Sequence, residues 1–130
     1  MSSNKVNVTG LSEAIEKELT LYADEAADVV KLSVRDVARA TRKEIAANAP
    51  RGRTGKYAKS WRTKKVYESS TSASYVVYAN EDGYRLAHLL EFGHAKRNGG
   101  RTRAFPHIKP AEERAAREIE AMTKARLGKL

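Results

Sequence analysis

The strongest constraint on the fold is a stretch of helical periodicity that runs from Leu11 to Ala49 without a Gly or a Pro. Apolar side chains recur there at steps of three or four residues, which is the spacing of one face of an α-helix. Pro50 disfavours a helical conformation at Ala49 and ends the stretch. The stripe comprises Leu11, Ile15, Leu19, Tyr22, Ala26, Val30, Val34, Val37, Thr41 and Ile45.

An unbroken helix of this length is too long for the domain that contains it. At 1.5 Å per residue it spans about 57 Å, whereas a compact domain of this size has a diameter of about 36 Å. Two interpretations therefore remain open. The helix either projects and buries its stripe against another subunit, or it breaks near Ser33. We expect one domain over residues 1–130, with a frayed and flexible N-terminus at residues 1–9.

The middle of the chain has the pattern of a β-hairpin. Residues 73–79 alternate in a way typical of a half-buried strand. Residues 58–68 are the expected partner strand, and the Ser/Thr run at 69–72 is the turn. A change of face between Thr63 and Val66 indicates a β-bulge. Two strands alone are marginal, so this hairpin needs a helix or a neighbouring subunit beside it.

The last third of the chain predicts two helices separated by a basic loop. A short amphipathic helix covers residues 84–92, and Gly93 ends it. An exposed loop at residues 94–104 follows, rich in Gly and Arg, and Pro110 begins the last helix. The sequence thus predicts an α+β fold with a long N-terminal helix, a small antiparallel β-sheet, a short middle helix and a C-terminal helix. Residues 101–105 are a candidate third strand.

The residues on either side of the basic loop are expected to anchor it to the core. Leu89, Leu90 and Phe92 should be largely buried for this purpose. Three roles remain open for Glu91: a general base, an ion pair with Arg85 or a loop arginine, or a cap for backbone amides. The predicted anchor comprises Leu89, Leu90, Glu91, Phe92, Gly93, Phe105, Pro106 and Pro110.

The positive charge of the chain is concentrated in two segments. The formal net charge is +9. Residues 51–68 carry a net charge of +6 and residues 85–109 carry +5, while the rest of the chain carries −2. Such clustering indicates a localised positive face for an acidic partner. The predicted docking residues are Arg51, Arg53, Lys64, Lys65, Arg97, Arg101 and Arg103.

Several classes of function lack the residues that they require. The chain has no Cys, which excludes disulfides and thiolate chemistry. His88, Glu91 and His94 do not match a metal-binding spacing, and no serine lies in a nucleophile motif. Residues 51–57 lack the spacing of a phosphate-binding loop. No apolar run is long enough to span a membrane. We therefore expect no enzymatic activity, cofactor, metal or membrane association, and a small hydrolase is disfavoured.

Nucleic-acid binding is the main alternative to a protein-docking role. Basic residues of segment 51–68 interleave with Tyr57, Trp61 and Tyr67, a mixture that can follow phosphates and stack bases. No helix-turn-helix, zinc finger or RNA-binding signature accompanies it. A basic nucleic-acid-binding accessory protein therefore remains an alternative.

Two motifs in order resemble one protein family. The first is Ala-Pro followed by Thr-Gly within residues 49–55, and the second is Leu-Glu-Phe-Gly at 90–93, a basic loop, and Ala-Phe-Pro-His-Ile-Lys-Pro-Ala at 104–111. Together they resemble the neck or tail-completion proteins of long-tailed phages, the gene-product-ten family, over residues 10–125. The chain departs from that pattern at His94, where a Thr is expected, and in the length of its basic loop.

The resemblance implies a non-enzymatic structural protein of the virion, located at the neck or tail junction and made in the host cytoplasm. It implies a homo-oligomeric ring at the connector, expected to be a hexamer, that joins the filled head to the tail or completes the tail. The implied partners are the adjacent connector and tail-tube rings. Non-specific contact with DNA in the channel is a further expectation.

Overall fold

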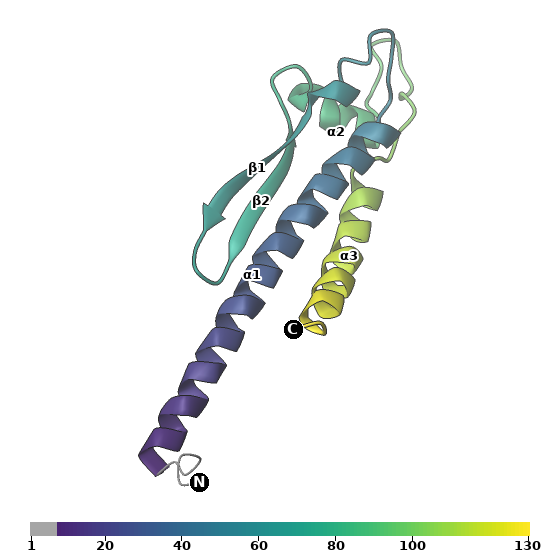
Figure 1. Cartoon of the computed structure of the whole chain (residues 1–130). Coiled ribbons are helices and arrows are strands. Elements are labelled where there is room, and N and C mark those ends of the chain that lie inside the picture. Colours follow the sequence, from purple (N-terminus) through teal and green to yellow (C-terminus); the bar gives the residue numbers. More distant parts are fainter. Residues whose placement is uncertain (1–7) are drawn as a thin grey trace.

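The computed structural model describes residues 8–130, and the chain has the predicted α+β layout (Figure 1). One long helix is followed by a hairpin, a short helix and a final helix. The elements are α1 (Val8–Asn48), the 3-10 helix η2 (Ala58–Ser60), β1 (Trp61–Glu68), β2 (Ala73–Ala79), α2 (Tyr84–Phe92) and α3 (Lys109–Leu127).

Helix α1 is a single unbroken element of 41 residues, which corresponds to about 60 Å. Ser33, where the sequence left a break open, lies inside the helix and is fully buried. The first part of α1 projects beyond the hairpin and beyond the end of α3 (Figure 1). Residues 1–7 lie outside the described residues, so the expected flexibility of 1–9 is untested there. Residues 8 and 9 are already helical.

Strands β1 and β2 form the predicted antiparallel hairpin. Pairing runs from Trp61 opposite Ala79 to Glu68 opposite Ala73. The register shifts between Lys65 and Tyr67, so the predicted bulge lies at Val66. The candidate third strand at residues 101–105 does not form: this segment makes a single isolated bridge, between Ala95 and Arg101, across a turn that contains Gly99 and Gly100.

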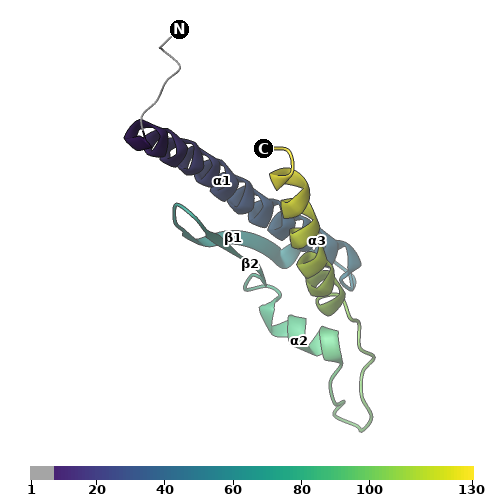
Figure 2. The same ribbon diagram turned by 90° about the horizontal axis from the view of Figure 1, so that it is seen from below.

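Helix α3 runs antiparallel to α1 along the second half of α1 (Figures 1 and 2). Near its start, Arg114 Nη1 lies 3.0 Å from Glu44 Oε1. Near its end, Arg126 Nη2 donates to Asp36 Oδ2 at 2.8 Å and Nη1 donates to Ser33 Oγ at 3.3 Å. These two contacts fix the part of α1 that α3 covers.

The core lies where α1 ends, between that end, η2, the start of β1, the end of β2 and the start of α3. Four of its seven buried members are alanines, so the layers approach closely but bury little apolar area. Leu90 and Ile108 are partly buried against it. The buried members are Ile45, Ala49, Tyr57, Ala58, Trp61, Ala79 and Ala111.

Candidate docking surface

Glu91, the next-to-last residue of α2, is the buried centre of the connection between α2 and α3. Its Oε1 accepts hydrogen bonds from the backbone N–H groups of His107 (2.8 Å) and Ile108 (2.9 Å), and its Oε2 accepts one from Lys109 N–H (3.0 Å). These amides open α3, and Ile108 at the N-cap provides no side-chain cap of its own. A carboxylate here satisfies free amides and lies at the positive end of the helix dipole.

His107 extends this connection toward the 3-10 helix. Its side chain is fully buried, and Nδ1 lies 2.6 Å from Phe105 O and 3.1 Å from Glu91 Oε1. Because a carbonyl oxygen only accepts, Nδ1 carries a hydrogen. At the other side of the ring, Nε2 forms a hydrogen bond with the Tyr57 hydroxyl at 2.7 Å. The pair joins segments that are 50 residues apart in sequence.

The pKa values of this cluster reflect its burial and its hydrogen bonds. Burial by itself raises the pKa of Glu91, but the hydrogen bonds from the backbone amides of His107, Lys109 and Ile108 outweigh it, and the pKa lies below its ordinary value. Burial raises the pKa of the Tyr57 hydroxyl, and the nearby charge of Glu91 adds to that shift. Glu91 is therefore ionised at neutral pH, and of the three roles left open for it the structure shows the cap for backbone amides.

Gly93 brings the far end of the basic loop back against α2. Its φ is +72°, and a Cβ there would lie 2.5 Å from Thr102 O. Only glycine fits this backbone without strain. Next to it, His94 N–H donates to Thr102 Oγ1 at 2.9 Å, and Thr102 N–H donates to His94 O at 2.8 Å. The base of the loop is therefore closed.

The loop at residues 94–104 carries the three predicted docking arginines, and the structure gives them different surroundings. Arg97 is exposed near the tip, beside the two glycines with positive φ. Arg101 Nη2 donates to Gly93 O at 3.2 Å. The guanidinium of Arg103 lies 5.2 Å from the centre of the Phe105 ring, a cation–π distance. Arg101 therefore also braces the loop, whereas Arg97 is available at its tip.

The other predicted docking residues lie in two places. Arg51 and Arg53 are exposed in the connection after α1, at the end of the molecule where α1 finishes. Lys65 lines a groove of about 650 Å³ between α1 and the hairpin, together with Lys31, Arg35 and Arg39 and the acidic Asp28 and Glu68, and Lys64 borders it. The side-chain amine of Lys64 lies over the Tyr78 ring, on the opposite face of β1. This groove lies along the middle of α1, away from loop 94–104 (Figure 1). The predicted docking set is therefore divided between the loop end and this cationic groove.

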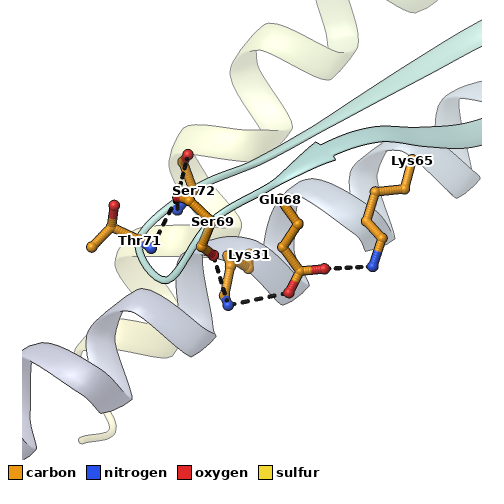
Figure 3. Close-up of polar contacts among 6 residues, drawn as sticks. All are labelled: Lys31, Lys65, Glu68, Ser69, Thr71 and Ser72. Carbon is orange, nitrogen blue, oxygen red and sulfur yellow. Dashed lines mark hydrogen bonds and ion pairs between the residues drawn. The ribbon is translucent and has the colours of Figure 1, made fainter.

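At the edge of the cationic groove, α1 contacts the tip of the hairpin (Figure 3). Lys31 Nζ lies 3.3 Å from Glu68 Oε2 and 3.2 Å from Ser69 O. Lys65 bonds the other oxygen of Glu68. Hydrogen bonds from Lys65 and then Lys31 lower the pKa of Glu68. Lys31 therefore links α1 to the tip of the hairpin.

A sequence profile of the family described as "Bacteriophage HK97-gp10, putative tail-component" matches residues 13–93, more than half of the chain. The chain belongs to this family. The match confirms the resemblance that the two motifs predicted. No curated protein and no solved structure gives a significant match. The family match includes most of α1, the hairpin, α2 and Gly93, and it ends where the basic loop begins.

The structure corrects one prediction about α2 of this family member. Leu89 and Phe92 are 38% and 60% exposed, so the expectation that they are buried in the core is wrong. Glu91 must face inward to reach the amides of α3, and Ala87 and Leu90 share that inward edge. This orientation turns Leu89 and Phe92 outward. Of the other predicted anchor residues, Gly93 is buried, whereas Phe105, Pro106 and Pro110 are exposed.

Two other kinds of site are absent from residues 8–130. That part of the chain contains no group of three or more His or acidic side chains arranged to hold a metal ion. None of the helices in it combines the length and the hydrophobicity of a membrane-spanning segment.

Sequence reasoning missed the hydrogen bond between Tyr57 and His107. No local motif marks a contact between residues so far apart.

Proposed function

We propose that this tail component is a non-enzymatic neck or tail-completion protein that forms a ring at the connector, expected to be a hexamer, and joins the filled head to the tail. Membership of a tail-component family supports the location in the virion. The observation that carries the proposal is the basic loop at residues 94–104, which projects from a braced base at one end of the molecule.

The loop has the properties of a docking element. Its base is held by Glu91, Gly93 and the contact between His94 and Thr102. A braced base lowers the entropy lost on binding, while the glycines at the tip let the loop adapt. Exposed Phe92 and Phe105 flank the same loop in sequence, and aromatic and Arg side chains are common among residues that dominate interface energies. We favour an acidic protein ring as partner.

Two further features support a ring. Helix α1 projects past the elements that it packs against, and the hairpin has only two strands. Both features favour burial against neighbouring copies. A contact between two different surfaces of identical subunits closes into a ring when its rotation closes.

The test is to replace Arg97, Arg101 and Arg103 with Ala in the phage. We expect heads and tails to form at normal yield and to fail to join. The matched control replaces three exposed cations of the last helix and its end, Arg117, Lys124 and Lys129, and should join normally. Because Arg101 also braces the loop, the single variant Arg97→Glu is included, and it should reduce joining without lowering the melting temperature. Normal joining in the triple variant would contradict the proposal.

The cationic groove keeps nucleic-acid binding as a second candidate function, since cations outnumber carboxylates along it. If DNA phosphates are the target, affinity should fall steeply with salt and be independent of sequence. We expect free DNA to bind only weakly at physiological salt. Tight, salt-sensitive binding that is lost in Arg39→Ala/Lys65→Ala would favour the second candidate instead.

A further inference from the structure

The first half of α1 has an apolar face that nothing in the described chain covers. Leu19 is 63% exposed and Tyr22 is 53% exposed, on the same stripe as Leu11 and Ile15. Helix α3 covers this stripe only as far as Ser33, where Arg126 contacts it. The uncovered part of α1 is about 30 Å long. A face of this length is typical of an interaction site.

The same half of α1 is strongly acidic. Residues 11–28 contain six acidic side chains and one basic side chain. Glu18 and Glu25, seven residues apart, lie along one edge of the apolar stripe, and Glu16 lies along the other edge. Two such helices placed side by side would repel each other. The charge therefore favours a basic surface as the cover for this stripe.

The hairpin has an uncovered surface of the opposite charge. Directly paired residues of two strands share a face, so Lys64 with Val76 and Arg62 with Tyr78 lie on one face. Tyr75 and Val77, on the other face, line grooves against α1. Val76 is exposed, and Lys64 Nζ lies over the Tyr78 ring at 5.4 Å. The outward face of the hairpin is thus apolar in its middle and cationic along β1.

We propose that residues 11–26 of α1 in one copy of this chain cover the outward face of the β1–β2 hairpin in the next copy. The inference rests on the proposed ring and names the contact that builds it. The occupant is a second copy, because the acidic stripe and the basic hairpin face complement each other in charge and in apolar character. One chain cannot make this contact with itself, since the unbroken helix carries residues 11–26 away from its own hairpin (Figure 1).

The contact joins two different surfaces, so it is head-to-tail. Each copy offers its helix to one neighbour and its hairpin to the other, and repetition closes a ring or continues a filament. The contact also gives the two-stranded hairpin a helix on each face, which is the kind of cover that so small a sheet needs.

Cysteine crosslinking in phage particles tests the contact directly, because the chain has no Cys of its own. A chain with Ile15→Cys and Val76→Cys, treated with a bismaleimide, should give a ladder of covalent multimers on a denaturing gel. The matched control is Asp24→Cys with Val76→Cys. Asp24 lies on the opposite side of α1 from Ile15, and this pair should give at least about tenfold less multimer if the stripe faces the hairpin.

Each outcome decides one point. Particles that contain the double variant without a ladder, or a ladder of equal yield from the Asp24 control, overturn the contact and leave the tail-component role intact. Covalent dimers from Ile15→Cys alone show helix-to-helix pairing and overturn it as well. Crosslinked products that contain a different protein would show that this protein, and not a second copy of the chain, lies against residues 11–26 of α1. Particles that lack the chain overturn the proposed function itself, and the contact with it.

A charge exchange provides an independent test. Glu18→Lys with Glu25→Lys should reduce incorporation into particles about tenfold, and Arg62→Glu with Lys64→Glu should do the same, because each places like charges together. All four changes in one chain should restore incorporation. Glu113→Lys with Glu120→Lys on α3 is the control and should have no effect. Failure of the fourfold variant, in a chain that melts at the normal temperature, would contradict the contact.

Discussion

The two halves of α1 have the same apolar periodicity and opposite surroundings. In the second half, Ser33, Val37 and Ile45 are buried, with Ile45 only 3% exposed. In the first half, Ile15 is 50% exposed. The difference arises because α3 and the hairpin lie along the second half only (Figures 1 and 2). Periodicity therefore identifies the face that needs a cover, and the positions of the other elements decide whether the same chain supplies it.

The comparison predicts unequal costs for the same substitution in the two halves. Ile45→Ala should lower the free energy of unfolding by about 2–5 kcal/mol, because it leaves a cavity in the core. Ile15→Ala should change it by less than about 0.5 kcal/mol in the isolated chain, as is usual at an exposed position. Denaturant unfolding of both variants measures the difference. Equal costs would show that the first half of α1 is covered even in the isolated chain.

Removing the carboxylate of Glu91 should loosen the cover over the second half of α1, because this group holds the start of α3. Glu91→Ala leaves three backbone amides without their acceptor. The free energy of unfolding should fall by about 3 kcal/mol. Glu91→Gln, which keeps one acceptor oxygen, should cost less. If Glu91→Ala melts like the unmodified chain, α3 does not depend on this cap.

The same residue predicts a dependence on pH. The folded pKa of Glu91 lies below its ordinary value of 4.5. Its contribution to stability is therefore present above pH 4.5 and is lost as the pH falls through the lowered folded value. Glu91→Gln should remove this part of the acid sensitivity, which unfolding curves at a series of pH values would measure. Identical acid sensitivity in the two proteins would assign the effect to other carboxylates.

The smallest expected effect concerns the end of α3 that borders the uncovered stripe. Arg126 donates to Asp36 and Ser33, and the hydrogen bond from Arg126 is the main cause of the lowered pKa of Asp36. The side chains of Arg126 and Asp36 are partly exposed. Arg126→Ala should therefore lower the free energy of unfolding by about 0.5–1 kcal/mol. Amide hydrogen exchange near residues 30–36 should quicken at the same time. Unchanged exchange there would mean that the packing of α3 alone sets the boundary between the two halves.

Local patterns were sufficient for most of the fold. The absence of Gly and Pro predicted α1, alternation predicted β2, and the change of face predicted the bulge at Val66. The orientation of α2 was not predictable in this way. The spacing of its leucines predicted that Leu89 faces the core. Glu91 faces inward instead, because its carboxylate bonds the backbone amides at the start of α3.

Contacts between distant segments account for the rest. The bond between Tyr57 and His107 and the packing of α3 on the second half of α1 depend on where the chain returns. No spacing within either segment encodes that return. Of the predicted docking residues, the sequence identified the exposed loop arginines but did not separate Arg97 from Arg101, which also bonds Gly93.

Hydrogen exchange of α1 in the isolated chain and in assembled tails tests most directly the claim that the first half is completed by assembly. In the isolated chain, amides of residues 11–26 should exchange much faster than those of residues 33–48. In tails that contain the chain, the first half should become protected to a similar degree as the second. Fast exchange of residues 11–26 in those tails would contradict the account.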